Sequence, residues 1–136
     1  MTVIELTSDR TVINETINVN GHKNFIIKGK SSRQSTIETS YDLALFEGAN
    51  SGEIYFFDVA LCGSEQYHNI CAVNIACDNQ GSVNAYRVLG YNLGNLFNLS
   101  QVRSGRFLFI RNFLVQHALT IDSGTDIFAD ALLNSY

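Results

Sequence analysis

The sequence INVNGHKNFIIKGKSSRQSTI, residues 17–37, contains three short apolar segments separated by two polar, turn-like stretches. Ile17 and Val19 alternate with asparagine, and Phe25 and Ile27 stand two residues apart after a glycine turn. A period of two is typical of β-strands that bury one face. Each segment is too short to form a stable sheet with one neighbour. The stretch therefore predicts one turn of an all-β solenoid, in which each strand pairs with the same strand of the next turn.

The apolar positions of this stretch recur later in the chain at a regular interval, which is the sign of a repeat architecture. The spacing from Phe25 to Ile54 equals the spacing from Ile54 to Val83, and a slightly shorter step then reaches Leu108. We expect these four residues to line up, one above another, inside a common core. The segment 118–133 continues the pattern as a shorter last rung, which gives about five rungs in all.

A second column follows from the same interval, which places Ile17 on Phe46 and Phe46 on Ile75. No segment in this part keeps apolar residues at the helical spacing i, i+3, i+4 and i+7, and β-branched and aromatic residues favour strands. The C-terminal sequence FADALLNSY, residues 128–136, is the exception. We expect it to form a short helix that caps the stack, because the terminal rungs of a solenoid usually need a cap.

The spacing inside a rung predicts a corner. In the segment EIYFFDVAL, Ile54 and Phe56 are two residues apart, whereas the next inward residue, Val59, comes three residues later. One extra residue must turn the chain there without reversing the alternation. Glycine, Asp and Asn tolerate the backbone angles of such a corner, whereas arginine does not share that preference. Successive rungs place these residues at the corner: Gly29, Asp58, Arg87 and Asn112.

Composition restricts the classes of partner. The chain has 136 residues, so residues 1–136 are expected to form one solenoid domain or a fragment of a longer protein. Only 16% of the residues are charged, against about 25% in typical domains. This low fraction suggests that the chain buries surface against copies of itself. The formal net charge is −4, and no nucleic-acid partner is expected because duplex binding needs a basic stripe.

The chain shows no signal for membrane insertion, secretion or metal binding. No apolar run is long enough to span a bilayer, and Met1 leads directly into the strand-like VIEL, so no signal peptide is expected. Three cysteines, an odd number, suit a reducing compartment. We expect Cys71 and Cys77 to be buried apolar residues. His68 has no partner at a metal-ligand spacing, so we expect no metal and no cofactor.

The opening segment TVINETINVNGHKNFIIKGKSSRQSTI, residues 11–37, resembles the start of domains in the pectate-lyase-like superfamily. In those domains a strand, a short turn and an I-x-I-x-G strand precede a T-I rung. The resemblance covers residues 11–116 and implies a right-handed parallel β-helix. The superfamily includes polysaccharide lyases, polygalacturonases and the trimeric tailspikes and tail fibres of bacteriophages. We favour the phage branch, whose members commonly start rungs in this way and lack proline-rich or disulfide-bonded elements.

The motifs of the superfamily's enzymes are not matched. Polygalacturonase-like members carry N-x-D, D-D and G-H-G motifs, whereas this sequence has only the pair Gly21-His22. Pectate-lyase-like members place calcium-binding aspartates near an arginine, and here Asp58, Arg87 and Asn112 would stack about 4.8 Å apart per rung. This column is either an acidic-sugar site or, as we favour, a corner ladder of mutually satisfied polar groups. We assign no catalytic residue.

A stripe of aromatic residues is expected on the outer face of the solenoid, where a solvated surface would be polar. A patch of this kind usually marks an interface. It either packs against neighbouring chains in a homotrimer or stacks the sugar rings of a polysaccharide, unless loops of the second rung cover it. We favour the trimer because phenylalanine cannot hydrogen-bond a sugar hydroxyl. The stripe comprises five aromatic residues and an adjacent arginine: Tyr55, Phe57, Tyr86, Phe107, Phe109 and Arg111.

These observations favour a structural, receptor-binding or glycan-binding β-helix module of a phage tail fibre or tailspike, located in the virion or the cytoplasm. A small polysaccharide lyase or glycoside hydrolase is the first alternative, but five rungs span only about 24 Å, which is short for a polymer groove. A small viral or bacterial protein that inhibits or scaffolds a host protein is the second alternative, and the acidic charge is compatible with it.

Overall fold

All regular secondary structure in the described part of the chain is β-strand. The computed structural model describes residues 1–31, 34–76, 81–100, 104–108, 119–121 and 128–131. The first sheet follows the order β1-β4-β7-β9-β11-β13, with β5 pairing beside β7 and β2 pairing with β5. Its strands are β1 (Thr2–Glu5), β2 (Arg10–Ile13), β4 (Phe25–Lys28), β5 (Thr36–Thr39), β7 (Glu53–Cys62), β9 (Ser82–Tyr91), β11 (Ser104–Leu108) and β13 (Phe128–Ala131).

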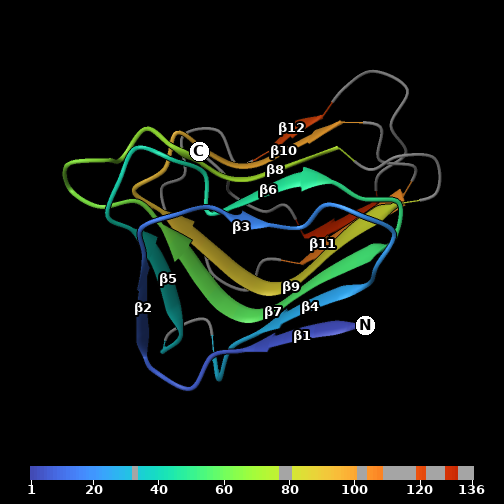
Figure 1. Cartoon of the computed structure of the whole chain (residues 1–136), viewed down its shortest axis with the longest axis horizontal. Helices are drawn as coiled ribbons and strands as arrows, with labels where there is room; N and C mark the ends of the chain where they lie inside the picture. Colours follow the sequence, from blue (N-terminus) through green and yellow to red (C-terminus); the bar gives the residue numbers. More distant parts are fainter. Residues whose placement is uncertain (32–33, 77–80, 101–103, 109–118, 122–127, 132–136) are drawn as a thin grey trace.

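The second sheet follows the order β12-β10-β8-β6-β3 and faces the first sheet (Figure 1). Its strands are β3 (Ile17–Asn18), β6 (Phe46–Ala49), β8 (Cys71–Ala76), β10 (Asn95–Ser100) and β12 (Leu119–Ile121). Every pairing between these strands is parallel, and the chain passes from one sheet to the other as it coils. The prediction of an all-β solenoid with parallel strands is confirmed.

The register between coils confirms the first column of core residues over three coils. Phe25 pairs with Ile54, and Ile54 pairs with Val83, so the regular interval of the sequence is also the interval between stacked strands. The fourth member is wrong, because Val83 pairs with Gly105 and Leu108 pairs with Tyr86. The next coil therefore reaches the equivalent position earlier in the sequence than expected, at Gly105.

Shorter connections explain that difference in interval. Eight residues separate Cys62 from Cys71 at the β7–β8 connection, whereas three separate Tyr91 from Asn95 at the β9–β10 connection. The fourth coil therefore closes sooner than the periodicity of the earlier coils suggests.

The second column shows a similar slip. Ile17 pairs with Phe46 as expected, but Phe46 pairs with Val73, and Ile75 pairs with Gly48 instead. A slip of two residues keeps the same side chains on the inner face, because strand side chains alternate with a period of two. Val73 and Ile75 are both buried, so the hydrophobic pattern alone does not distinguish the two registers.

The core lies between the two sheets and contains a cluster of three phenylalanines. Phe46 of β6, Phe56 of β7 and Phe97 of β10 are fully buried. The rings of Phe46 and Phe56 meet edge to face with centroids 5.1 Å apart, and those of Phe56 and Phe97 meet in the same way at 6.0 Å. Edge-to-face pairs at these distances are favourable beyond the burial of their area. The cluster therefore joins the sheets across the solenoid.

Single residues turn the chain at the expected corner. Asp58 has a φ of 55° and Arg87 a φ of 54°, and each divides its long strand into two halves. The first half of β7 pairs with β4 and the second half with β5. In the preceding coil Gly29 instead begins the longer connection between β4 and β5. Asn112 lies outside the described residues.

The helix expected over residues 128–136 is not observed in its described part. Phe128–Ala131 is strand β13, which pairs in parallel with β11. Pairing with the preceding coil outweighs the weak helical preference of this segment. Residues 132–136 lie outside the described part of the chain. No helix with the length and apolar character needed to cross a membrane occurs among the described residues.

Candidate functional site

Three outward-facing aromatic residues lie together on β7 and β9, and we call them the aromatic platform: Tyr55, Phe57 and Tyr86. Along β7 the half-buried Tyr55 and Phe57 alternate with the fully buried Ile54 and Phe56, which fixes their outward direction. Phe57 pairs directly with Tyr86 one coil later. The alternation along one strand and the register between strands therefore bring the three rings to one place.

The rings of the aromatic platform stack on one another. The centroids of Phe57 and Tyr86 are 5.2 Å apart with planes 11° from parallel, and those of Tyr55 and Phe57 are 5.8 Å apart with planes 3° from parallel. Stacked aromatic pairs contribute about 0.5–1.5 kcal/mol beyond area burial. The stack therefore holds three large apolar side chains in a fixed arrangement on an outer face.

One end of the aromatic platform carries a polar contact. The Tyr55 hydroxyl donates a hydrogen bond to Oε2 of Glu53, at 3.1 Å. Burial raises the pKa of Tyr55 above its ordinary value, and the hydrogen bond and negative charge of Glu53 raise it further. Asn84, which pairs with Tyr55, donates to the carbonyl of Ile54 at 3.3 Å and to Ser82 Oγ at 3.1 Å. The polar groups at this end are thus already engaged.

Among the residues predicted for the stripe beyond Tyr86, only Phe107 lies in the described part of the chain. Phe107 pairs with Ala85, so its register column is that of the buried Phe56 and not that of Tyr86. Leu108 occupies the position opposite Tyr86. The shorter fourth coil causes this displacement, as it does for the core column. Phe109 and Arg111 lie outside the described residues.

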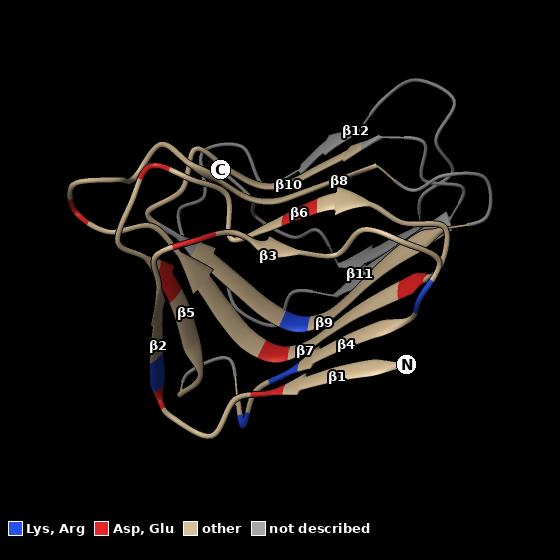
Figure 2. Cartoon of the chain, in the orientation of Figure 1, with Lys and Arg blue, Asp and Glu red and all other residues tan. Residues whose placement is uncertain are grey.

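The corner residues Asp58 and Arg87 form a forked ion pair. Arg87 donates from Nε to Oδ1 of Asp58 at 2.5 Å and from Nη2 to Oδ2 at 3.0 Å. The pair links the acidic residue at the bend of β7 to the basic residue at the bend of β9, drawn red and blue in Figure 2. The hydrogen bond that Arg87 donates to the Asp58 carboxylate raises the pKa of Arg87, against a smaller opposing effect of burial. Each of these two charged groups therefore has the other as its partner.

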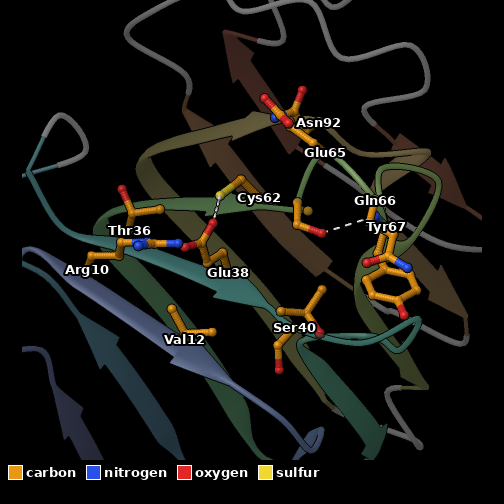
Figure 3. Close-up of a pocket in the computed structure, with 13 residues that line it drawn as sticks. Arg10, Val12, Thr36, Glu38, Ser40, Cys62, Glu65, Gln66, Tyr67 and Asn92 are labelled. Carbon is orange, nitrogen blue, oxygen red and sulfur yellow. Dashed lines mark hydrogen bonds and ion pairs between the residues drawn. The ribbon is translucent and has the colours of Figure 1, made fainter.

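The structure also contains a pocket that sequence patterns did not reveal. It has a volume of about 620 Å3 and lies over the outer side of β2 and β5, beside the β7–β8 loop (Figure 3). Its lining includes Arg10, Val12, Glu38, Cys62, Gln66 and Tyr67. The long β7–β8 loop returns over strands of earlier coils, so its residues meet partners that are distant in sequence. The polar loop sequence GSEQYHN was the available signal, since the equivalent β9–β10 connection is much shorter.

Glu38 is the central charged group of this pocket. Its carboxylate accepts a hydrogen bond from Nε of Arg10 through Oε1, and the thiol of Cys62 lies 4.0 Å from Oε2. The Glu38 side chain is 13% exposed, whereas that of Arg10 is 71% exposed. Register explains the contact with the thiol, because Glu38 pairs with Cys62 in the adjacent strand.

The β7–β8 loop that forms one wall is held by its own hydrogen bonds. Ser64 N donates to the carbonyl of Tyr67 at 3.2 Å, and Tyr67 N donates to Ser64 Oγ at 3.0 Å. Gly63 N donates to the carbonyl of Asn92 in the next coil at 3.1 Å. The β7–β8 loop is therefore attached to the next coil through Gly63, and a turn from Ser64 to Tyr67 is held by its own hydrogen bonds.

No group of three or more His, Cys, Asp or Glu side chains that could hold a metal ion occurs in the described part of the chain. Cys71 contributes a half-buried thiol on β8, and burial raises its pKa to about 11.

Comparisons with models of known protein families, with curated proteins and with solved structures found no match for this chain.

Proposed function

We propose that this chain is a structural β-helix module of a bacteriophage tail fibre or tailspike, and that it assembles as a homotrimer through the aromatic platform. The main support for the homotrimer is the stack of Tyr55, Phe57 and Tyr86 on an outer sheet face. A sheet face that meets only water is normally polar. Three stacked aromatic rings gain most when a second apolar surface covers them.

The stripe continues as an apolar column toward the N-terminal coil. Val3 pairs with Ile26, and Ile26 pairs with Tyr55, so these side chains lie in one outward column across three coils. Val3 is 56% exposed and Ile26 is half-buried. An interface along this column would run parallel to the solenoid axis, which suits the side-by-side packing of identical solenoids about a threefold axis.

Stacked rings favour a protein surface over a sugar at this position. Phe57 has a ring neighbour in both Tyr55 and Tyr86, so the stack itself occupies ring faces on which a sugar would lie. Phenylalanine also offers no hydrogen bond to a hydroxyl. Packing against another chain requires neither a free ring face nor a polar partner, and we therefore favour a protein as the occupant.

The coil is proposed to be right-handed, with about five rungs, because connections between parallel strands of one sheet are right-handed in about 98% of cases. In this proposal the module functions in the virion. A glycan receptor remains compatible with a fibre module but requires a different site from the platform. The engaged Asp58–Arg87 pair offers no free group for an acidic sugar, so no lyase activity is proposed.

Size-exclusion chromatography with light scattering tests the assembly. We expect the mass of three chains for the unmodified protein and of one chain for Phe57→Ser, because a hydroxyl in the stack removes apolar contact area. Tyr41→Ser is the matched control, since Tyr41 is 54% exposed and lies outside the platform. Circular dichroism must show the same strand content in all three proteins.

A strictly monomeric mass at high protein concentration would contradict the homotrimer. In that case the same surface would be open to a different protein, as expected of a chain that inhibits or scaffolds a host factor. A trimer that survives Phe57→Ser with unchanged stability would place the interface elsewhere.

A further inference from the structure

The first coil leaves one end of the solenoid core uncovered. Each of its strands, β1, β2 and β3, pairs with the next coil on one edge, and the described residues place no strand on the other edge. The inward residues Ile4, Ile13 and Ile17 pack against the core but are only partly buried. The residues that pair with them one coil later are buried: Ile27, Thr39 and Phe46.

Exposed apolar side chains gather at the same end. Met1, Val3 and Val12 are 81%, 56% and 49% exposed. An open strand edge that carries apolar residues is a template for pairing with another chain. We infer that this end pairs with the same end of a second copy of the chain, in a head-to-head dimer with twofold symmetry. This surface is an end of the solenoid, whereas the aromatic platform lies on an outer sheet face.

The hydrogen bonds of β1 show which backbone groups its open edge offers. The amides of Thr2 and Leu6 each donate to a carbonyl of the next coil at 2.9 Å. Successive residues of a strand direct their backbone groups to opposite edges. Val3 and Glu5 therefore direct their N–H and C=O groups to the open edge.

The hydrogen bonds of β2 give the same arrangement. The carbonyls of Asp9 and Ile13 accept from amides of the next coil, at 2.9 and 3.0 Å. The backbone groups of Thr11 face the same way, because it lies two residues from each of them. Arg10 and Val12 therefore direct their N–H and C=O groups to the open edge.

A twofold axis through the turn at residues 6–9 lets both strands pair at once. It sets β1 antiparallel to β2 of the second copy, and β2 antiparallel to β1 of that copy. Val3 then lies opposite Val12, and Glu5 lies opposite Arg10. All four residues direct backbone groups to the open edge, so both are hydrogen-bonded pairs of an antiparallel ladder. β1 and β2 each have four residues, so neither strand extends past the other.

This register also matches the apolar side chains. On the inner side, Ile4 lies opposite Thr11 and Ile13 lies opposite Thr2 of the second copy, so the two open cores cover each other. On the outer side, the pairing of the two valines removes from water apolar surface that the single chain exposes.

Charge complementarity favours the same register. Glu5 and Arg10 are exposed, and opposite charges directly across an antiparallel pair are stabilising. Nε of Arg10 donates to Glu38, and the terminal amino groups of a guanidinium can donate to a second carboxylate. Glu5 pairs with Lys28 in β4. Across the dimer the charged residues therefore alternate in sign: Lys28 and Glu5 of one copy, then Arg10 and Glu38 of the second copy.

Other occupants match this end less well. If β1 paired with β1 of the second copy, Glu5 would lie opposite Val3 or Met1, and β2 would stay open. A single peptide strand from another protein would also cover only one of the two edges. A second copy presents two strands at the same corner and therefore covers both.

Sedimentation equilibrium between about 10 µM and about 1 mM chain tests the inference. Two short strand pairs form a small interface, which is typical of weak association. We therefore expect the mass to double as the concentration rises, from three chains to six in the unmodified protein and from one to two in Phe57→Ser. A rise from one chain to two in both proteins would support the end contact and contradict the homotrimer of the proposed function.

Charge reversal in the Phe57→Ser chain tests the predicted pairs. Glu5→Arg places two arginines opposite each other and Arg10→Glu places two glutamates there, so each should weaken the dimer at least about tenfold. Mixing the two variants places opposite charges at both contacts and should restore the doubling of mass. Glu47→Arg, which reverses an exposed carboxylate on β6, is the matched control and should pair as the Phe57→Ser chain does.

Amide hydrogen exchange tests the register itself. Protection should rise with concentration at the amides of Val3, Glu5, Arg10 and Val12, whereas Thr2 already donates within the chain. The inference is overturned if the mass does not double, if it grows beyond doubling, or if Glu5→Arg pairs as well as Glu47→Arg. A mixture of the two charge-reversed variants that stays unpaired, or protection confined to β1, would also overturn it.

Discussion

Arg87 and Asp58 occupy the same left-handed corner one coil apart, with φ of 54° and 55°, and their side chains form a forked ion pair across the coils. A residue with a side chain in this backbone region is disfavoured by about 1–2 kcal/mol. A partly exposed ion pair contributes only about 0–1 kcal/mol. The corner at Arg87 is therefore held by the surrounding strands, and the ion pair offsets part of its strain.

Substitutions at Arg87 separate the backbone strain from the ion pair. Arg87→Gly relieves the strain while losing the ion pair, so we expect its free energy of unfolding to remain within about 1 kcal/mol of the unmodified chain. Arg87→Val also loses the ion pair but adds a β-branched side chain at positive φ. We expect it to be about 2 kcal/mol less stable than Arg87→Gly. Urea denaturation of both variants measures the difference, and equal stabilities would show that the corner is not strained.

The corner illustrates what the sequence could predict. The step of three residues between Phe56 and Val59 identified its position, because only an added residue keeps the alternation of inward side chains. The presence of arginine there could not be explained from local preference. Its explanation is Asp58, which belongs to the preceding coil and becomes a neighbour only when the coils stack.

The aromatic core cluster provides a test of packing. Phe56 contacts Phe46 and Phe97 from the opposite sheet and is fully buried. We expect Phe56→Ala to lower the free energy of unfolding by about 3–5 kcal/mol, because it leaves a cavity between the sheets. Phe56→Leu keeps most of the apolar volume and should lose less than about 2 kcal/mol. Thermal and urea unfolding measure both, and similar losses would mean that the site collapses around the smaller side chain.

Two glycines distinguish backbone strain from steric contact. Gly48 has a φ of 152°, and a Cβ there would lie 2.7 Å from Asn20 Oδ1 and 2.9 Å from Asn20 N. Gly21 has a φ of 127°, but a Cβ there would meet no atom within 4 Å. Asn20 Oδ1 accepts a hydrogen bond from Ala49 N at 2.7 Å, so Gly48→Ala would displace a contact that joins two coils.

We therefore expect Gly48→Ala to be more destabilising than Gly21→Ala by about 0.5–1.5 kcal/mol, the usual net contribution of one intramolecular hydrogen bond. Gly21→Ala should show only the strain of its backbone angle, on the order of 1 kcal/mol. Melting temperatures of the two alanine variants give the order directly. The reverse order would mean that strand β6 shifts to accept the new methyl group.

Loop length explains what the sequence could not predict. The regular interval holds from Phe25 through Ile54 to Val83, although the connections are distributed differently in the two coils: the first has a long β4–β5 connection and the second a long β7–β8 connection. The interval fails at Leu108, where the connections shorten. Hydrophobic periodicity specifies which face of a strand is buried, but a slip of two residues leaves that face unchanged. The sequence did not predict the pocket for a related reason, because Glu38 and Gln66 line one pocket only when the β7–β8 loop folds back over β5.

The thiol of Cys71 gives a prediction for pH dependence. Burial is the largest cause of its raised pKa of about 11, and contacts with the backbone of Asn98 and Val73 act in the opposite direction. Because only the thiolate reacts, alkylation of Cys71 by iodoacetamide in the folded chain should rise with a midpoint near pH 11. In urea the midpoint should return to about 8.5. Site-resolved mass spectrometry follows Cys71 separately from the other two cysteines.

The same shift predicts the direction of a stability change. The folded chain binds the Cys71 proton more tightly than the unfolded chain does, so this contribution is fully present below the unfolded pKa and is lost as the pH rises through the folded pKa. Between about pH 9 and 11, the unmodified chain should therefore lose more stability than Cys71→Ser, which has no thiol to ionise. The difference between the two proteins isolates Cys71 from the tyrosines and lysines that titrate in the same pH range. If the free energy of unfolding fell with pH at the same slope in both proteins, a protonated thiol protected by burial at this position would be contradicted.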